Sequence, residues 1–139
     1  MKPPSYAIKA EVQNSEAEVF VLRQQKTMYG GKTIAVGDSA FIFASENEGG
    51  TGLIAYGVVT SAEALPLNPS LERQTPRVSV TIQRKATAKR RLGRKELKPF
   101  SGWNDGRPET ELNFKFYRQA TNKVVGISAE TAAYLLSFF

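Results

Sequence analysis

The sequence has no cysteine and no histidine among its 139 residues. Without these side chains, zinc sites built on cysteine or histidine, thiol nucleophiles and Ser-His or Cys-His catalytic relays are all excluded. Long apolar runs are also missing, since the longest are far shorter than the roughly 18 residues of a transmembrane helix, and the opening MKPPSYAIKAEV has no apolar core typical of a signal peptide. We therefore expect a soluble, cytoplasmic protein with no membrane partner, no metal site and no cofactor.

Size and composition indicate a single folded domain. A hydrophobic fraction of 41% in 139 residues is enough to bury a core without help from metals or disulfides. The net charge is +6, and much of it lies between Arg84 and Lys98, where the only opposing residue is Glu96. Such a cluster is typical of a surface that binds phosphate backbones or another acidic partner, although a solvated loop or helix face can have the same composition. The candidate phosphate contacts are Lys89, Arg90, Arg91, Arg94 and Lys95.

The stretch YGGKT, residues 29–33, raises the question of a nucleotide-binding P-loop. A Walker A loop needs a further glycine five residues before its Gly-Lys-Thr, because consecutive backbone N–H groups must wrap a phosphate before a helix begins. That position holds Lys26, and the chain continues as IAVGDSAFIF, in which Gly37 and Asp38 predict a turn into a strand. The stretch fails both tests and is not a P-loop.

Alternating or β-branched apolar residues predict most of the chain to be β-structure. We expect strands at residues 5–12, 38–45, 52–65 and 77–87, with 46–52 as a hairpin connection and 65–76 as a proline-punctuated loop. Residues 15–25 allow two interpretations. Ser15 and Glu18 have the spacing of a helix capping box, whereas the VFVL stretch favours a strand.

Short helices are expected mainly in the C-terminal third. Residues 92–100 predict a short basic helix that ends before Pro99, and the first half of 113–127 fits helix or strand equally well. Ser128 is a candidate N-cap for a closing helix that directs Tyr134, Leu135 and Phe138 to the core. The whole pattern predicts an α+β, barrel-like fold with few short helices.

The order of these pieces resembles the EVE domain family of the PUA-like superfamily. The stretch IAVGDSAFIFAS is similar to the family's Gly-Asp step into an aromatic strand, and GLIAYGVVTSAEA to its GIxGxAxVVSxA pattern. Farther on, VSVTIQRKATAKRRLGRKELK is similar to a strand followed by a Leu-x-x-x-x-Leu-Lys helix, and YRQATNKVVGISAETAAYLL to an Arg-Gln pair, a strand and the final helix. The similarity touches nearly the whole chain.

This resemblance implies a small twisted β-barrel with flanking short helices, formed by residues 1–139 as one domain. It also implies a concave site for nucleic acid, RNA or DNA, which in some members holds a modified base in an aromatic pocket. A flipped base loses a few kcal/mol of stacking, which aromatic planes and hydrogen bonds to its edges can restore. The candidate residues for binding the nucleic acid or its base are Tyr29, Gly30, Gly31, Lys32, Ser45, Trp103, Asn104, Tyr117 and Arg118.

Each candidate also has a purely structural explanation. The 29–31 loop could be a tight turn, and Ser45 an ordinary residue at the end of a strand. Trp103 could plug the core from a surface loop, and Arg118 could form a salt bridge with Glu109 or Glu111. The period-two phenylalanines Phe41, Phe43, Phe114 and Phe116 are expected in the core.

Two other functions remain open at this point. A metal-dependent nuclease of a related PUA-like type would use carboxylates, for which Asp38, Glu46, Glu48, Asp105 and Glu109 are available. No two of these have a spacing that favours general acid-base catalysis, and Asp38 fits a turn. A protein-interaction adaptor would use the basic face for an acidic partner. The oligomeric state is left open.

Overall fold

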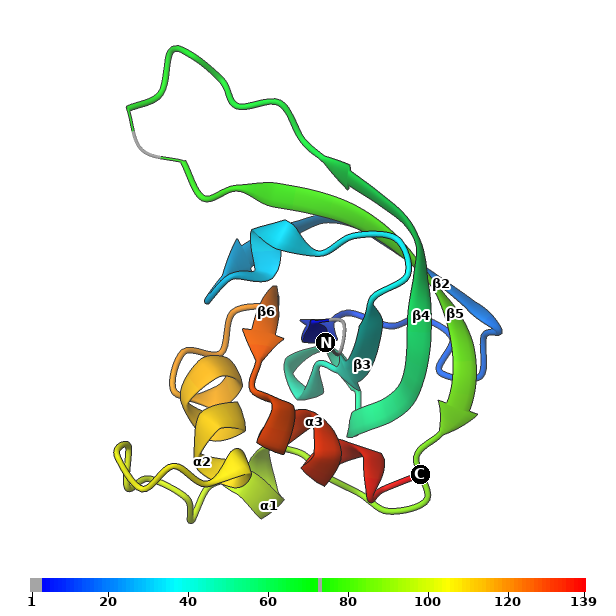
Figure 1. The fold of residues 1–139 in the computed structure, drawn as a ribbon, viewed down its shortest axis with the longest axis vertical. Coiled ribbons are helices and arrows are strands. Elements are labelled where there is room, and N and C mark those ends of the chain that lie inside the picture. The colour runs from blue at the N-terminus through cyan, green and yellow to red at the C-terminus, as the bar shows by residue number, and fades with distance from the viewer. Residues whose placement is uncertain (1–3, 73) are drawn as a thin grey trace.

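A closed β-barrel forms the centre of the computed structural model, which describes residues 4–72 and 74–139 (Figure 1). Around the barrel the strands follow the order β1-β3-β4-β5-β2-β6. Their bounds are β1 (Ser5–Ala10), β2 (Val19–Met28), β3 (Ser39–Ala44), β4 (Gly52–Ala64), β5 (Arg77–Thr87) and β6 (Lys123–Ile127). β1 runs parallel to β3, whereas β3–β4 and β4–β5 are antiparallel pairs, so the sheet is mixed.

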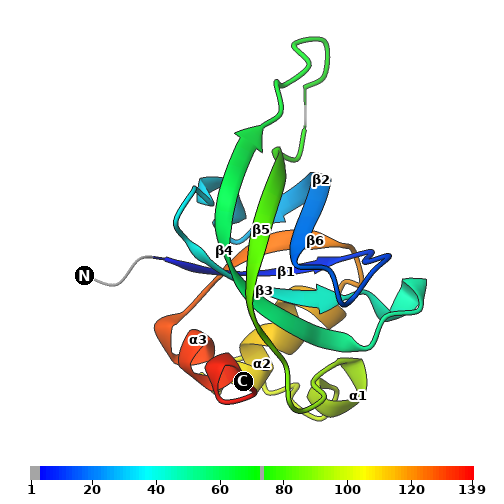
Figure 2. The same ribbon diagram turned by 90° about the vertical axis from the view of Figure 1, so that its right-hand side faces the viewer.

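The three α-helices of the described residues gather at one end of the barrel. The α-helices are α1 (Arg94–Leu97), α2 (Pro108–Leu112) and α3 (Ala129–Leu136); short 3-10 turns are η1 (Gly31–Thr33) and η2 (Glu46–Glu48), and a π-helical turn, η3 (Asn113–Tyr117), continues α2. Figure 2 shows α1, α2 and α3 together at this end, while the β4–β5 hairpin projects from the opposite end. The architecture confirms the predicted α+β barrel with short flanking helices.

The strands divide the apolar residues between two clusters, because alternate side chains point to opposite faces of a strand. One cluster fills the barrel and includes Ile8, Ile42 and Ile82. The other lies between the barrel and the helices, where Phe43 packs on Phe116 with ring centroids 5.1 Å apart. The helical end of the barrel is therefore held by its own apolar core.

The structure decides the open secondary-structure predictions. Residues 15–25 form no helix, because Phe20 and Leu22 alternate inward as the strand β2 requires. The first half of 113–127 is the π-helical turn η3, and β6 follows it. Ser128 does cap α3, since its Oγ accepts a hydrogen bond from the Thr131 N–H at 3.2 Å.

Of the four phenylalanines expected in the core, Phe114 was predicted wrongly. Phe41, Phe43 and Phe116 are buried, whereas Phe114 is half-buried and faces the site described below. In the predicted proline-punctuated loop of 65–76, the described residues 65–72 and 74–76 form no helix or strand. Arg73 lies outside the described residues. In the described part of the chain, no helix has the length and apolar character needed to cross a membrane.

Candidate nucleic-acid interface

Two half-exposed aromatic rings flank a third on the helical end of the barrel. The side chains of Tyr29 and Trp103 are 42% and 44% exposed. Each meets the ring of Phe114 roughly edge to face, with ring centroids 5.9 Å apart for Tyr29 and 5.5 Å apart for Trp103. Phe114 therefore positions both outer rings while each keeps part of its surface in solvent. Trp103 is not the buried core plug that its loop position also allowed.

The backbone around Tyr29 is held in a conformation that few residues adopt. Tyr29 has φ 52° and Gly30 has φ 84°, both left-handed, which costs a non-glycine residue about 1 kcal/mol. Gly31 passes so close to β6 that an added Cβ would overlap the carbonyl group of Val124. The glycine pair thus allows the turn, and the N–H of Gly126 fixes it by donating to the Tyr29 carbonyl oxygen at 3.1 Å. Unusual backbone of this kind is often found at functional sites.

Two cations lie over these rings. The guanidinium carbon of Arg118 is 4.5 Å from the centroid of Phe114 and 6.0 Å from that of Trp103. The Nζ atom of Lys115 is 5.4 Å from the centroid of Tyr29. All three distances are within the range of cation–π attraction. Positive charge therefore accompanies the aromatic group.

Arg118 is exposed and does not form the salt bridge that was considered for it. Within residues 4–72 and 74–139, it forms no ion pair with Glu109 or Glu111. Its charge is consequently free to meet an anionic group from solvent.

A cavity of about 450 Å³ opens beside Trp103 and Phe114. This volume falls in the range of roughly 300 to 1,000 Å³ that is usual for small-ligand sites. Its lining combines an aromatic face with amide, hydroxyl and charged groups: Trp103, Asn104, Gly106, Arg107, Thr110, Glu111, Phe114, Lys115, Ser128 and Glu130. The cavity can therefore receive a flat ring that carries hydrogen-bonding edges.

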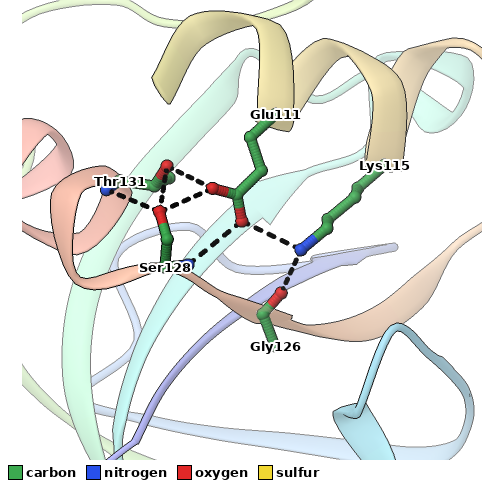
Figure 3. A network of polar contacts seen from close by, with 5 residues as sticks. All are labelled: Glu111, Lys115, Gly126, Ser128 and Thr131. Atoms are coloured by element: carbon green, nitrogen blue, oxygen red, sulfur yellow. Dashed lines mark hydrogen bonds and ion pairs between the residues drawn. The ribbon is translucent and has the colours of Figure 1, made fainter. Parts of the chain in front are cut away.

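One wall of this cavity is fixed by a hydrogen-bond network around Glu111 (Figure 3). One carboxylate oxygen accepts from the Oγ of Ser128 at 2.7 Å and the Oγ1 of Thr131 at 2.6 Å. The other accepts from the Ser128 N–H at 3.1 Å and the Nζ of Lys115 at 2.9 Å. Lys115 also donates to the Gly126 carbonyl oxygen at 2.7 Å. The network joins α2, η3, β6 and α3 at one point.

Glu111 is consequently held as a carboxylate. Its burial alone would raise its pKa, but the hydrogen bonds from Thr131, Lys115 and Ser128 outweigh that effect, and the pKa is lowered. An ionised carboxylate whose oxygens already accept four hydrogen bonds supports the wall and is poorly suited to transfer protons.

Tyr117 lies outside this cavity, although it was predicted to share a pocket with Tyr29 and Trp103. Its hydroxyl donates to the Oε1 of Glu46 at 2.8 Å, and the Nζ of Lys9 is 5.0 Å from its ring centroid. Burial, followed by the hydrogen bond to Glu46, raises its pKa, so the phenol stays protonated. The structure brings Tyr29 and Trp103 together through Phe114 and places Tyr117 in a separate cluster. Of the three predicted pocket aromatics, only Trp103 lines the cavity, and Tyr29 lies beside it.

Ser45 belongs to the buried side of the molecule. Its side chain is only 2% exposed, and no hydrogen-bond partner is found for its Oγ atom among the described residues. The neighbouring strands also bury two lysines, Lys9 and Lys123, which pair across β1 and β6 and donate to carbonyl oxygens at 2.8 and 2.9 Å. Burial, followed by the charges of Lys123 and Arg94, lowers the pKa of Lys9 to about 8. Ser45 is not on the surface of the cavity beside Trp103.

The remaining candidates of the two loops are on the surface. Lys32 is exposed in η1, next to the glycine pair, and Asn104 is exposed at the rim of the cavity. Lys32 does not line the cavity, so it can meet only a ligand that extends beyond it.

The basic segment between Arg84 and Lys98 runs from the end of β5 through α1, and some of its side chains form contacts within the protein. Arg90 donates to the Ser137 carbonyl oxygen at 2.9 Å and lies over Phe138, while Arg94 donates to the Oδ1 of Asn47 at 2.9 Å. Lys89 and Lys95 are exposed, and Arg91 approaches Glu96 only at 4.0 Å. Because α1 packs on α2 and η3, this segment is joined to the helical layer that holds the cavity.

Phe114, Lys115 and Glu111 were not among the predicted site residues. Pro108 followed by acidic residues is a helix-start signal, and a helix from Pro108 would place residues three and four apart on one face. Glu111, Phe114, Lys115 and Arg118 have that spacing. The period of two of Phe114 and Phe116 instead favoured a strand with both rings in the core, so this helical spacing was not recognised.

The carboxylates considered for catalysis mostly serve local structure. Asp38 accepts from the Ala35 N–H at 2.8 Å in the turn before β3. Glu46 accepts from the Arg94 N–H at 2.6 Å, and Glu48 from the Asn122 amide at 3.0 Å. Asp105 accepts from the Arg107 N–H at 2.9 Å, which is the main cause of its lowered pKa. Among the described residues, no three acidic side chains gather as they do in a metal site.

Solved structures share this fold at low sequence identity. The human THYN1 protein, solved with DNA that contains 5-methylcytosine, is 17% identical, with a TM-score of 0.63 over 96% of each chain. A protein from Pseudomonas putida is 18% identical, with a TM-score of 0.63 over 96% of this chain and 98% of that one. The ZmASCH protein from Zymomonas mobilis is 12% identical, with a TM-score of 0.54 over 96% and 97%.

A scan against protein-family models and a search of curated proteins find no match. The DUF55 domain of human thymocyte nuclear protein 1 is 15% identical, with a TM-score of 0.62 over 96% of each chain. These likenesses show that the chain shares the fold of these proteins, a small β-barrel with short flanking helices. They also agree, at the level of the fold, with the resemblance to the EVE family.

Proposed function

We propose that this protein is a nucleic-acid-binding module that takes one base into the cavity beside Trp103 and Phe114. The observation that carries the proposal is the pair of half-exposed rings, Tyr29 and Trp103, held by Phe114 next to a cavity of about 450 Å³. THYN1, which has the same fold, was solved with DNA that contains 5-methylcytosine. A methylated cytosine is therefore the first base to test on this chain.

The base is held by stacking and by its polar edges. Stacking on an aromatic side chain contributes about 1 to 3 kcal/mol per base, and the indole of Trp103 offers the largest such surface here. The Asn104 amide can both donate and accept, and the Arg107 guanidinium can donate to ring nitrogens and carbonyl oxygens. The apolar part of Phe114 suits a methyl group on the base.

The phosphates are held by residues outside the cavity. Lys89 and Lys95 are exposed and form no ion pair among the described residues. Arg118 is also exposed, with its guanidinium carbon 4.5 Å from the centroid of Phe114. Each phosphate contact changes the slope of log K against log salt by about 0.9 on duplex DNA and about 0.7 on a single strand. Lys32 adds a further charge beside the Tyr29 loop.

The test is a titration of labelled oligonucleotides that differ only in one cytosine or 5-methylcytosine, as single strands and as duplexes, at several salt concentrations. Fluorescence anisotropy gives the affinity of each. We expect Lys89→Glu/Lys95→Glu to weaken binding to every sequence equally and to reduce the salt slope by about two contacts. The matched control is Arg23→Glu/Lys26→Glu, which makes the same charge change on β2 and should affect binding less.

A base preference that disappears in Trp103→Ala but persists in Lys89→Glu/Lys95→Glu supports the assignment of the two roles. Equal affinity of all oligonucleotides for the wild-type protein and for Trp103→Ala would contradict the base-binding cavity. Equal loss in both charge variants would show that only net charge matters, and it would contradict a phosphate-binding role for Lys89 and Lys95.

A further inference from the structure

The barrel is closed on one side by a very short seam. β2 pairs with β6 only at Thr27 and Met28, whereas it pairs with β5 from Val19 to Lys26. In the described part of the chain, the Val19–Lys26 stretch therefore has a strand partner on one side only. An open strand edge of this length is a template for another extended chain.

The pairing with β5 shows which backbone groups face the open edge. The Arg84 N–H donates to the Glu18 carbonyl oxygen at 2.8 Å, so Glu18 and every second residue after it face β5. In an antiparallel pair the residues between them direct their N–H and C=O groups to the other side. Val19 and Val21 consequently offer unpaired main-chain donors and acceptors along one line. Arg23 adds its N–H, since its carbonyl oxygen already accepts from the Nε2 of Gln25 at 2.8 Å.

A groove follows this edge. Two adjoining hollows of about 600 and 350 Å³ are lined by consecutive residues of β2, from Val19 to Lys26. Consecutive residues of a strand line the same hollow when it runs along the strand edge, because alternate side chains point to opposite faces. The opposite wall is formed by residues that follow β1, including Glu11 and Gln13, and by Thr121 and Asn122.

The ends of the groove differ in charge. Arg23, Lys26 and Arg77 line the larger hollow, where Glu11 is the only acidic residue of the lining. The smaller hollow has no basic residue in its lining. Val19 and Val21 are 44% and 56% exposed on the outer face of the strand. A partner segment that matches this surface is extended, acidic where it meets the basic end, and apolar elsewhere.

A β-bulge marks the basic end of the edge. Gln24 has φ 54°, and the register between β2 and β5 shifts there. Its N–H donates to the Oγ of Ser79 at 3.0 Å and its carbonyl oxygen accepts from Arg77 at 2.7 Å. Bulges re-aim side chains and are common next to functional sites. Here the bulge places basic side chains where an added strand would end.

We propose that the open edge of β2 binds an extended acidic segment of a partner protein by β-strand addition. The main chain of the segment pairs with Val19, Val21 and Arg23, and its acidic side chains meet Arg23, Lys26 and Arg77. The occupant follows from charge: the larger hollow is lined by Arg23, Lys26 and Arg77, with Glu11 as its only acidic lining residue, which suits an acidic segment and not a second copy of this basic chain. This site is separate from the proposed nucleic-acid interface and does not depend on it.

The test uses a short peptide of alternating valine and glutamate, blocked at both ends, with the full-length protein. Hydrogen exchange of backbone amides followed by NMR reports on the edge directly. We expect the peptide to slow exchange of the Val19, Val21 and Arg23 amides at least about tenfold, and to leave amides of β3 unchanged. The absence of such protection at millimolar peptide would overturn the proposal.

A variant at the edge separates main-chain pairing from simple charge attraction. Val21→Pro removes an N–H that β5 does not use, and proline is tolerated on edge strands where the N–H faces solvent. We expect it to weaken peptide binding at least about tenfold, while Val21→Thr, which keeps the N–H and the β-branched shape, stays within about twofold. Equal affinity of both variants, with native spectra, would overturn the proposal.

Two further measurements identify the partner class. Arg23→Glu/Lys26→Glu should weaken binding of the acidic peptide at least about tenfold. A single-stranded oligonucleotide of the same net charge should leave the Val19 and Val21 amides unprotected. If the oligonucleotide protects them and the peptide does not, the edge is a nucleic-acid site and the proposed peptide partner is wrong.

Discussion

The two sides of the π-helical turn η3 differ in how far their side chains are committed to the fold. On one side, Trp103 and Tyr29 rest on Phe114 and keep almost half of their surface in solvent. On the other side, the hydroxyl of Tyr117 is used by Glu46, and its ring is covered by Lys9. Both sides contain aromatic rings and positive charge. Only the first keeps these groups available to a ligand, which is why we place base binding there.

The largest effect is expected at Glu111, which supports the available side. Glu111→Ala removes an acceptor shared by Lys115, Ser128 and Thr131, and this partly buried ion pair falls at the low end of the about 3 to 5 kcal/mol that losing one partner of a fully buried pair costs. We expect a loss of about 3 kcal/mol in the free energy of unfolding, measured by urea denaturation. Glu109→Ala, on the same helix, is the matched control and should change it by less than about 0.5 kcal/mol. Similar losses in both variants would contradict the role of the network.

A pH-dependent effect is expected on the committed side, at Lys9. Its pKa falls from 10.5 to about 8 in the folded protein, so between these pH values the unfolded chain binds more protons and stability rises with pH. Lys9→Met should remove this rise, which amounts to at most about 3 kcal/mol. Urea denaturation of both proteins at pH 7, 8, 9 and 10 measures the difference. If the two proteins differed in free energy of unfolding by the same amount at every pH, the pKa of Lys9 would be the same in the folded and unfolded states, and the prediction would be wrong.

Trp103→Ala should separate binding from stability. Loss of one stacking surface of about 1 to 3 kcal/mol lowers the affinity for the preferred base by roughly 5-fold to 150-fold. Because Trp103 is 44% exposed, the free energy of unfolding should fall by less than about 1 kcal/mol. Trp103→Phe keeps a smaller ring and should retain an intermediate base preference in the anisotropy titration. An unchanged base preference in Trp103→Ala would contradict a role of Trp103 in base binding.

Tyr117→Phe should show the reverse pattern with a smaller effect. It removes the hydrogen bond to the Glu46 carboxylate, and the cost of such a bond is about 1 to 2 kcal/mol. We expect this loss in urea denaturation and no change in oligonucleotide affinity. If Tyr117→Phe weakened base preference as much as Trp103→Ala, the division of η3 into an available and a committed side would be wrong.

Most of the barrel could be predicted from local patterns. Val78, Val80 and Ile82 alternate as a strand requires, and Ser128 has the side chain of an N-cap. β2 was ambiguous, because a capping-box spacing at Ser15 competed with the alternation of Phe20 and Leu22. The alternation prevailed because both side chains are buried in the barrel, a tertiary effect that a local window does not contain.

The candidate site was harder to predict, because it depends on one irregular turn. Phe114 and Tyr117 are three residues apart, and on an α-helix they would share a face. In η3 the Arg118 N–H instead donates to the Asn113 carbonyl oxygen at 2.9 Å, which widens the turn and rotates the two rings apart. Trp103 and Tyr29 come from loops far apart in sequence, so their shared contact with Phe114 follows from the fold and not from spacing.

The most direct test of base binding is the intrinsic fluorescence of Trp103, the only tryptophan of the chain. The wild-type protein is titrated with single-stranded and duplex oligonucleotides that contain cytosine or 5-methylcytosine at one position, at low and at physiological salt. We predict quenching that depends on the identity of this base and persists when salt is raised, because stacking is not screened. Binding that salt abolishes, with no change in Trp103 emission for any base, would contradict the account and leave only a basic surface.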